Sequence, residues 1–188
     1  MLSGNSGRAW LPGLALTGLI MVIDSVRLIL FPAIMAFAAS SDLLTMTISN
    51  RVSIILVGGF FALALVSGIG PVEILSHAGA GAVVLVVAFG FFTRGWIGGG
   101  DAKLAAATAL WFGFDYLLTY LVYASLIGGA LTLLLIRFRL APLPELLAGQ
   151  IWAERLHQPD GAVPYGIALA AAALVVYPDT PWMKAIGM

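Results

Sequence analysis

The sequence of residues 95–103 is Gly95-Trp96-Ile97-Gly98-Gly99-Gly100-Asp101-Ala102-Lys103. This stretch separates two apolar runs, at 78–92 and 104–112. Three successive glycines give a backbone that can adopt positive φ and approach another segment closely, and the alanine-rich residues after Lys103 predict the start of a helix. An acid at a helix start can be a simple cap. Beside membrane-length apolar sequence, however, an ionisable group is costly and usually functional, so Asp101 is the first candidate functional residue.

The composition is that of a membrane protein. Hydrophobic residues make up 61% of the 188-residue chain and charged residues 10%, whereas soluble domains carry about 25% charged residues. We therefore expect an all-α, polytopic transmembrane helix bundle. The formal net charge of zero gives no reason to expect a nucleic-acid partner. The absence of cysteine excludes disulfides and thiolate metal sites, and His77 and His157 do not suggest a metal site, so we expect no metal and no cofactor.

The apolar runs predict about six membrane spans. An N-terminal extension at 1–25 begins with polar residues expected to be a frayed end. Its Leu11–Ile23 stretch is too short to cross a bilayer and is predicted to lie at the interface, with one long helix kinked at Pro32 as the alternative. A transmembrane domain at 26–178 and a C-terminal tail at 179–188 follow. The spans are predicted near residues 28–40, 52–67, 75–92, 102–112, 116–136 and 163–177.

Alternation of six spans puts the loops at 42–51, 93–101 and 137–162 on one side of the membrane. The middle of the third loop is predicted to form a short surface helix. These loops contain or adjoin six of the nine basic residues, namely Arg51, Arg94, Lys103, Arg137, Arg139 and Arg155. Because basic residues are more frequent on the cytoplasmic side, we expect these loops, with Asp42 and Asp101, to face the cytoplasm.

Asp42 and Asp101 are the acids predicted at the cytoplasmic ends of spans, next to apolar sequence. Two carboxyl groups that share a water can hydrolyse a peptide bond. The ionised group takes a proton from the attacking water, and the protonated group donates to the developing oxyanion. Two acids held close together in a low dielectric titrate as a unit, and one of them stays protonated. The pair therefore suits aspartic peptidase chemistry.

Three segments resemble the signatures of type IV prepilin peptidases. Residues 98–104, Gly98-Gly99-Gly100-Asp101-Ala102-Lys103-Leu104, contain a GxGD motif and resemble the second active-site signature. Asp42, followed by Ile48-Ser49-Asn50-Arg51, resembles the first signature, and Val163-Pro164-Tyr165-Gly166 resembles the segment that opens the last span. The resemblance covers roughly residues 28–177.

The resemblance implies a membrane aspartic endopeptidase of the bacterial inner membrane, multi-pass, with its active site facing the cytoplasm. Members of this family remove the short basic leader from prepilins or pseudopilins after a glycine. Asp42 and Asp101 would then be the catalytic pair, and Gly98 and Gly100 would shape the loop that presents Asp101. Lys103 matches a motif position and would either position that loop or bind lipid headgroups. The implied partners are the prepilin or pseudopilin substrate and the lipid bilayer.

The chain departs from the larger members of the family in two ways. Ser49 stands where proline is common, and the cytoplasmic, cysteine-bearing segment of the bifunctional members is absent. The chain thus resembles the short, peptidase-only form of tight-adherence (Flp-type) pilus systems. One alternative is an archaeal-type preflagellin peptidase. Another is a non-enzymatic transporter or assembly subunit whose paired acids bind an ion or protons.

Overall fold

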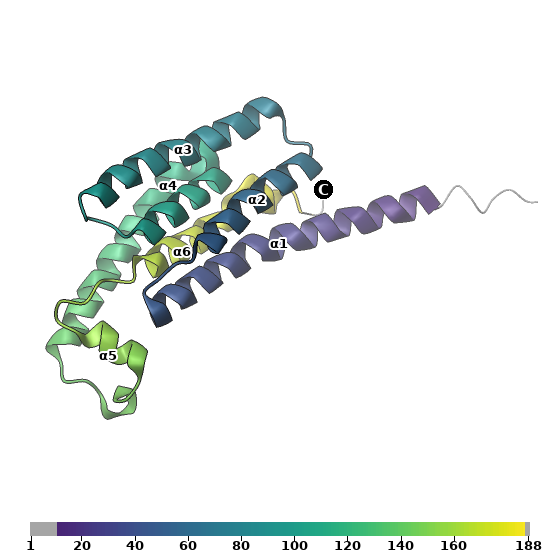
Figure 1. Ribbon diagram of the computed structural model, residues 1–188. Coiled ribbons are helices and arrows are strands. Elements are labelled where there is room, and N and C mark those ends of the chain that lie inside the picture. Colours follow the sequence, from purple (N-terminus) through teal and green to yellow (C-terminus); the bar gives the residue numbers. More distant parts are fainter. Residues whose placement is uncertain (1–10, 187–188) are drawn as a thin grey trace, which may run out of the picture.

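Helices form nearly all of the chain between residues 11 and 186, the part that this computed structural model describes, with side chains described from residue 17 on (Figure 1). The longer helices are α1 (Leu11–Thr45), α2 (Asn50–Val66), α3 (Pro71–Thr93), α4 (Gly99–Leu140) and α6 (Tyr165–Val176). The shorter ones are α5 (Ile151–His157), α7 (Pro181–Lys184) and the 3₁₀ turns Glu145–Leu147 and Tyr177–Asp179. No strand occurs between residues 11 and 186. The expected frayed N-terminal end lies outside the described residues.

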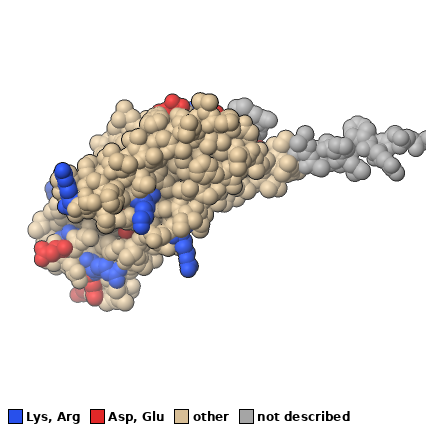
Figure 2. All heavy atoms as spheres, turned by 45° about the horizontal axis from the view of Figure 1, so that its top comes forward, with Lys and Arg blue, Asp and Glu red and all other residues tan. Residues whose placement is uncertain are grey.

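The outer surface of the bundle is apolar, as a bilayer requires. Three helical stretches are long and apolar enough to cross a membrane, in α1, α3 and α4, and α2 and α6 are shorter apolar helices. Leu65, Val86 and Leu118 are each more than half exposed, on three different helices. Most charged atoms in Figure 2 lie in the half of the molecule away from the grey residues, and a broad uncharged surface covers the rest. The predicted all-α membrane helix bundle is confirmed.

The first helix differs from its prediction. Leu11–Ile23 was expected to form a separate piece, but α1 runs from Leu11 to Thr45 without interruption and contains Pro32. Asp24 and Arg27 do not end the helix because they pair with each other at 3.2 Å. Arg27 also donates to the Ser67 hydroxyl at 2.7 Å, at the end of α2. Where residues 11–23 lie relative to the bilayer stays a prediction.

The fourth and fifth predicted spans are the two halves of α4, and the chain reverses between them at Gly113. Gly113 has φ 60° and ψ −173°, a conformation open essentially only to glycine. A Cβ at this position would also lie 3.0 Å from the ring of His77 on α3. Because of the reversal, Asp101 and Thr132 line the same cavity; in a straight helix, residues so far apart in sequence would be separated by about 46 Å.

Three connecting segments, 46–49, 94–98 and 141–164, gather at one end of the bundle, which we call the loop end (Figure 1). Arg155 of α5 donates to the Leu44 carbonyl at 3.1 Å and so ties the third segment to α1. Arg139 donates to the carbonyls of Leu156 and Ala162 within the same segment. The predicted surface helix is present, as a 3₁₀ turn followed by α5. The expectation that these three loops share one side is therefore met.

Candidate active site

Asp42 lies near the C-terminal end of α1, at the loop end, and is only 5% exposed. Its Oδ2 atom accepts a hydrogen bond of 2.7 Å from the backbone N–H of Gly166. Gly166 is in the first turn of α6, where N–H groups lack partners within the helix and carry the positive end of the helix dipole. The start of α6 therefore supplies a donor and a field that stabilise negative charge on Asp42.

Asp101 lies in the first turn of α4 and is partly buried. Gly98 caps this helix with φ −71° and ψ 147°, and a Cβ on Gly98 would lie 3.0 Å from Oδ2 of Asp101. Positive φ occurs at Gly95, with φ 73°, and at none of Gly98–Gly100. The three successive glycines therefore do not use their freedom at positive φ, because they cap and begin a helix.

The two acids line one cavity of about 670 Å³ at the loop end, and their carboxyl groups interact electrostatically. The remaining lining residues come from the glycine-rich stretch, the second half of α4, the end of α1 and the segment that leads into α6: Met46, Gly95, Trp96, Ile97, Gly98, Thr132, Ala162, Val163 and Tyr165. In the part of the chain that the structure describes, no basic side chain forms an ion pair with either acid of the cavity.

Ile48 joins the three segments that carry the sequence resemblance. A Cβ on Gly100 would lie 3.2 Å from the Cβ of Ile48, and one on Gly166 would lie 2.5 Å from its Cδ1. Glycine at both positions thus lets α4 and α6 approach the connection between α1 and α2. Lys103 donates to Asn50 Oδ1 at 2.9 Å, which is a contact between the first and second signatures.

Sequence reasoning gave no role to two glycines that shape the cavity. Gly166 was part of a quoted segment, but only the structure brings it to Asp42. Gly128, buried in the second half of α4, leaves room for Tyr165, because a Cβ there would overlap the tyrosine hydroxyl. Small residues inside a membrane span often mark close helix contacts, and the pair Gly128-Gly129 is such a signal.

No arrangement of three or more His, Asp or Glu side chains suited to a metal ion occurs in the described part of the chain. What the cavity offers is a pair of carboxyl groups with unequal surroundings. Asp42 is buried against the start of α6, whereas Asp101 lies in the first turn of α4, directly after the glycine-rich stretch. Such a pair can take and give protons in one reaction.

A family model described as the type IV leader peptidase family matches residues 29–133, more than half of the chain. The matched region contains Asp42 and Asp101 and ends before α6 begins. No curated protein and no solved structure matches the chain. The family match thus covers both candidate acids.

Proposed function

Because the chain belongs to the type IV leader peptidase family, we propose that it is an aspartic endopeptidase that removes the short basic leader of prepilins or pseudopilins after a glycine. Asp42 and Asp101 act as its catalytic pair. One observation carries the aspartic assignment: these two acids, from different helices, line one cavity, and no basic side chain of the described residues forms an ion pair with either of them. Membership of the family supports the peptidase activity itself and the class of substrate.

The surroundings of the two acids support a division of roles. Asp42 accepts the Gly166 N–H at the start of α6, which favours its charged form, so it acts as the base. Burial and the negative charge of Asp42 keep the proton on Asp101, because two neighbouring carboxyl groups resist ionising together. Asp42 takes a proton from a water as the water oxygen attacks the scissile carbonyl carbon, and Asp101 gives its proton to the developing oxyanion. When the tetrahedral intermediate collapses, the C–N bond breaks, the leaving amine takes the proton held by Asp42, and Asp101 recovers its own.

Charge supports the orientation and location within the proposal. Five arginines and Lys103 lie in or next to the three segments of the loop end, and α5 and its neighbours add Glu145, Glu154 and Asp160. Since the membrane rule counts basic residues and gives little weight to acids, the loop end faces the cytoplasm. The cavity then opens where a membrane-anchored substrate leaves the bilayer on the cytoplasmic side of the inner membrane.

Co-expression with a candidate prepilin tests the function. We expect the prepilin to lose its leader, detected as a mobility shift, and mass spectrometry to place the new N-terminus directly after a glycine. The matched control is the same prepilin without the peptidase. If candidate prepilins kept their leaders in membranes where the peptidase is present at a normal level, the proposed function would be wrong.

The close approach of Gly100 to Ile48 gives a second prediction. Gly100→Val places a branched side chain where a Cβ alone would lie 3.2 Å from Ile48. The turn that carries Asp101 must then move, and we expect cleavage to fall by about 10²-fold, as displacements of about 1 Å can do. The neighbouring Gly99→Ala meets only the ring of Phe92, which is exposed and can rotate.

Gly99→Ala should therefore stay within about twofold of the unaltered rate, as surface changes usually do. The rates are compared in membranes at matched protein levels. Equal losses in the two variants would contradict a specific role for the contact between Gly100 and Ile48.

A further inference from the structure

A second cavity adjoins the candidate active site and opens on the flank of the bundle. It has a volume of about 300 Å³ and lies between α3, both halves of α4 and α6. We call it the flank groove. Its walls are apolar and include Val84, Val87, Ala88, Leu121, Ala124 and Leu169.

The flank groove and the cavity of the two acids meet at one place. Ile97, Asp101 and Tyr165 line both. On the loop side of Asp101 the walls contain glycines and the second acid, whereas on the flank side they are mostly valine, leucine and alanine side chains. Asp101 thus stands at a boundary between polar and apolar surroundings. A chain that occupied both spaces would pass the candidate catalytic carboxyl at that boundary.

We propose that the flank groove receives the apolar, membrane-embedded segment of the substrate that begins directly after the cleaved bond. This inference rests on the proposed function. The flank groove is continuous with the active-site cavity at Asp101. Its occupant therefore contacts the acid that, in the proposed function, acts on the peptide bond, and this argues that the occupant is part of the polypeptide substrate. The apolar walls and the position on the flank of a membrane bundle require that segment to be apolar and to enter from the bilayer.

The size of the groove determines how much of the segment it takes. A helix about 10 Å across with a rise of 1.5 Å per residue fills about 120 Å³ per residue. A groove of about 300 Å³ therefore accepts the side chains of one helix face rather than a whole helix. Ala88 and Ala124 are buried at its base, 6% and 4% exposed, and their small side chains leave the room. Contacts on the substrate should recur every three to four residues.

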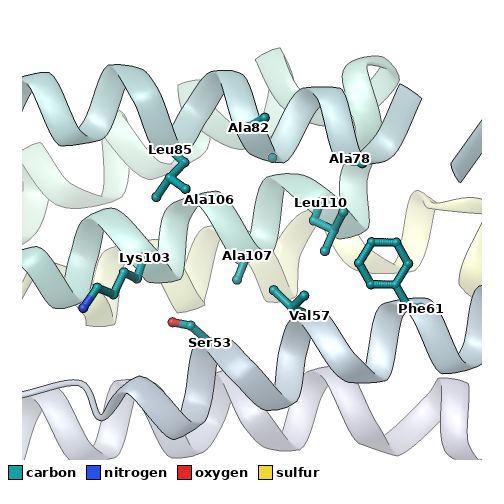
Figure 3. A pocket seen from close by; sticks show the side chains of 11 residues that line it. Ser53, Val57, Phe61, Ala78, Ala82, Leu85, Lys103, Ala106, Ala107 and Leu110 are labelled. Atoms are coloured by element: carbon teal, nitrogen blue, oxygen red, sulfur yellow. The ribbon is translucent and has the colours of Figure 1, made fainter. Parts of the chain in front are cut away.

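The chain offers a matched control on the other face of α3. A groove of about 310 Å³ lies there between α2, α3 and the first half of α4, and it touches neither Asp42 nor Asp101. Figure 3 shows Leu85 of α3 above Ala106 of α4 in this control groove. Leu85 and Val87 are two residues apart and 47% and 50% exposed. The same substitution at either position therefore starts from a similar side-chain exposure, but in a different groove.

Cross-linking tests the proposal without relying on cleavage. The chain has no cysteine, so Val87→Cys and Leu85→Cys each create a single thiol, here combined with Asp42→Asn to retain uncleaved substrate. The partner is a prepilin with one cysteine, moved through its first apolar turns. We expect a disulfide-linked adduct with Val87→Cys, strongest at substrate positions three to four residues apart, and at least several-fold less with Leu85→Cys. Equal adduct yields, or none with either, would overturn the proposal and leave lipid as the occupant.

A second experiment fills the flank groove with a larger side chain and measures the rate of leader removal. Val87→Trp should fill the flank groove and lower leader removal by about tenfold, the equivalent of losing the contacts of one buried aliphatic side chain. Leu85→Trp should leave the rate near that of the unaltered chain. Normal cleavage by Val87→Trp would contradict the docking role while leaving the proposed function in place. If the unaltered chain did not cleave the prepilin at all, the proposed function would be rejected, and this inference with it.

Discussion

Asp42→Asn and Asp101→Asn are each expected to lower leader removal by at least about 10²–10⁴-fold, the contribution of a general acid or base. An amide cannot take a proton from the attacking water as a carboxylate does, nor give one to the oxyanion as a carboxylic acid does. The change is nearly isosteric, and the amide oxygen of an asparagine at position 42 can still accept the Gly166 N–H. Both variants should therefore reach the membrane at normal levels.

The measurement is the rate of leader removal from a co-expressed prepilin, normalised to the amount of peptidase. Asp115→Asn is the matched control, because Asp115 is an exposed acid of the same helix α4 that does not line the cavity. It should cleave at the unaltered rate. Substantial cleavage by either active-site variant would remove that residue from the catalytic pair.

Gly166→Ala should lower cleavage by about 10²-fold, the cost of misplacing a reacting group by about 1 Å. Its Cβ would lie 2.7 Å from Oδ2 of Asp42 and 2.5 Å from Cδ1 of Ile48. Side chains can yield where a backbone cannot, so the expected response is a rotation of Asp42 away from the start of α6. The carboxyl would then lose both its N–H donor and its present position in the cavity that it shares with Asp101.

Stability separates this effect from general disruption. Alanine has the higher helix propensity, so the melting temperature of Gly166→Ala should change little while the rate falls. Gly129→Ala is the control, because a Cβ there meets nothing within 4 Å, and it should retain full activity. A Gly166→Ala variant that cleaved normally would show that the contact with Asp42 does not matter to the reaction.

Local sequence was enough to predict the fold class and the ends of most helices. Apolar runs of membrane length can bury their backbone hydrogen bonds only as helices, and glycine and proline mark where the runs stop. The break between the two halves of α4 near Gly113 and the helix start beside Asp101 agree with these local rules. Local rules wrongly predicted a break in α1 at Asp24 and Arg27. The two side chains pair with each other, and Arg27 also donates to Ser67 at the end of α2, so the helix continues through them.

The reason for the glycines also depended on the fold. Their freedom at positive φ was predicted from the residue type alone, but Gly98 has an ordinary extended backbone. Gly100 and Gly166 are needed for space, since Ile48 packs against both. A close approach between segments is a property of the packed helices and leaves no local pattern in any one of them.

The sequence by itself determined that this protein is a bundle of apolar helices with two acids at helix ends, because hydrophobicity and residue spacing act within each segment. Only the tertiary structure decided that Asp42 meets the first turn of α6, that Asp101 lines the same cavity as Asp42, and that an apolar groove adjoins Asp101. These features join residues from separate helices. Their distances are determined by how the helices pack, which no single stretch of sequence encodes.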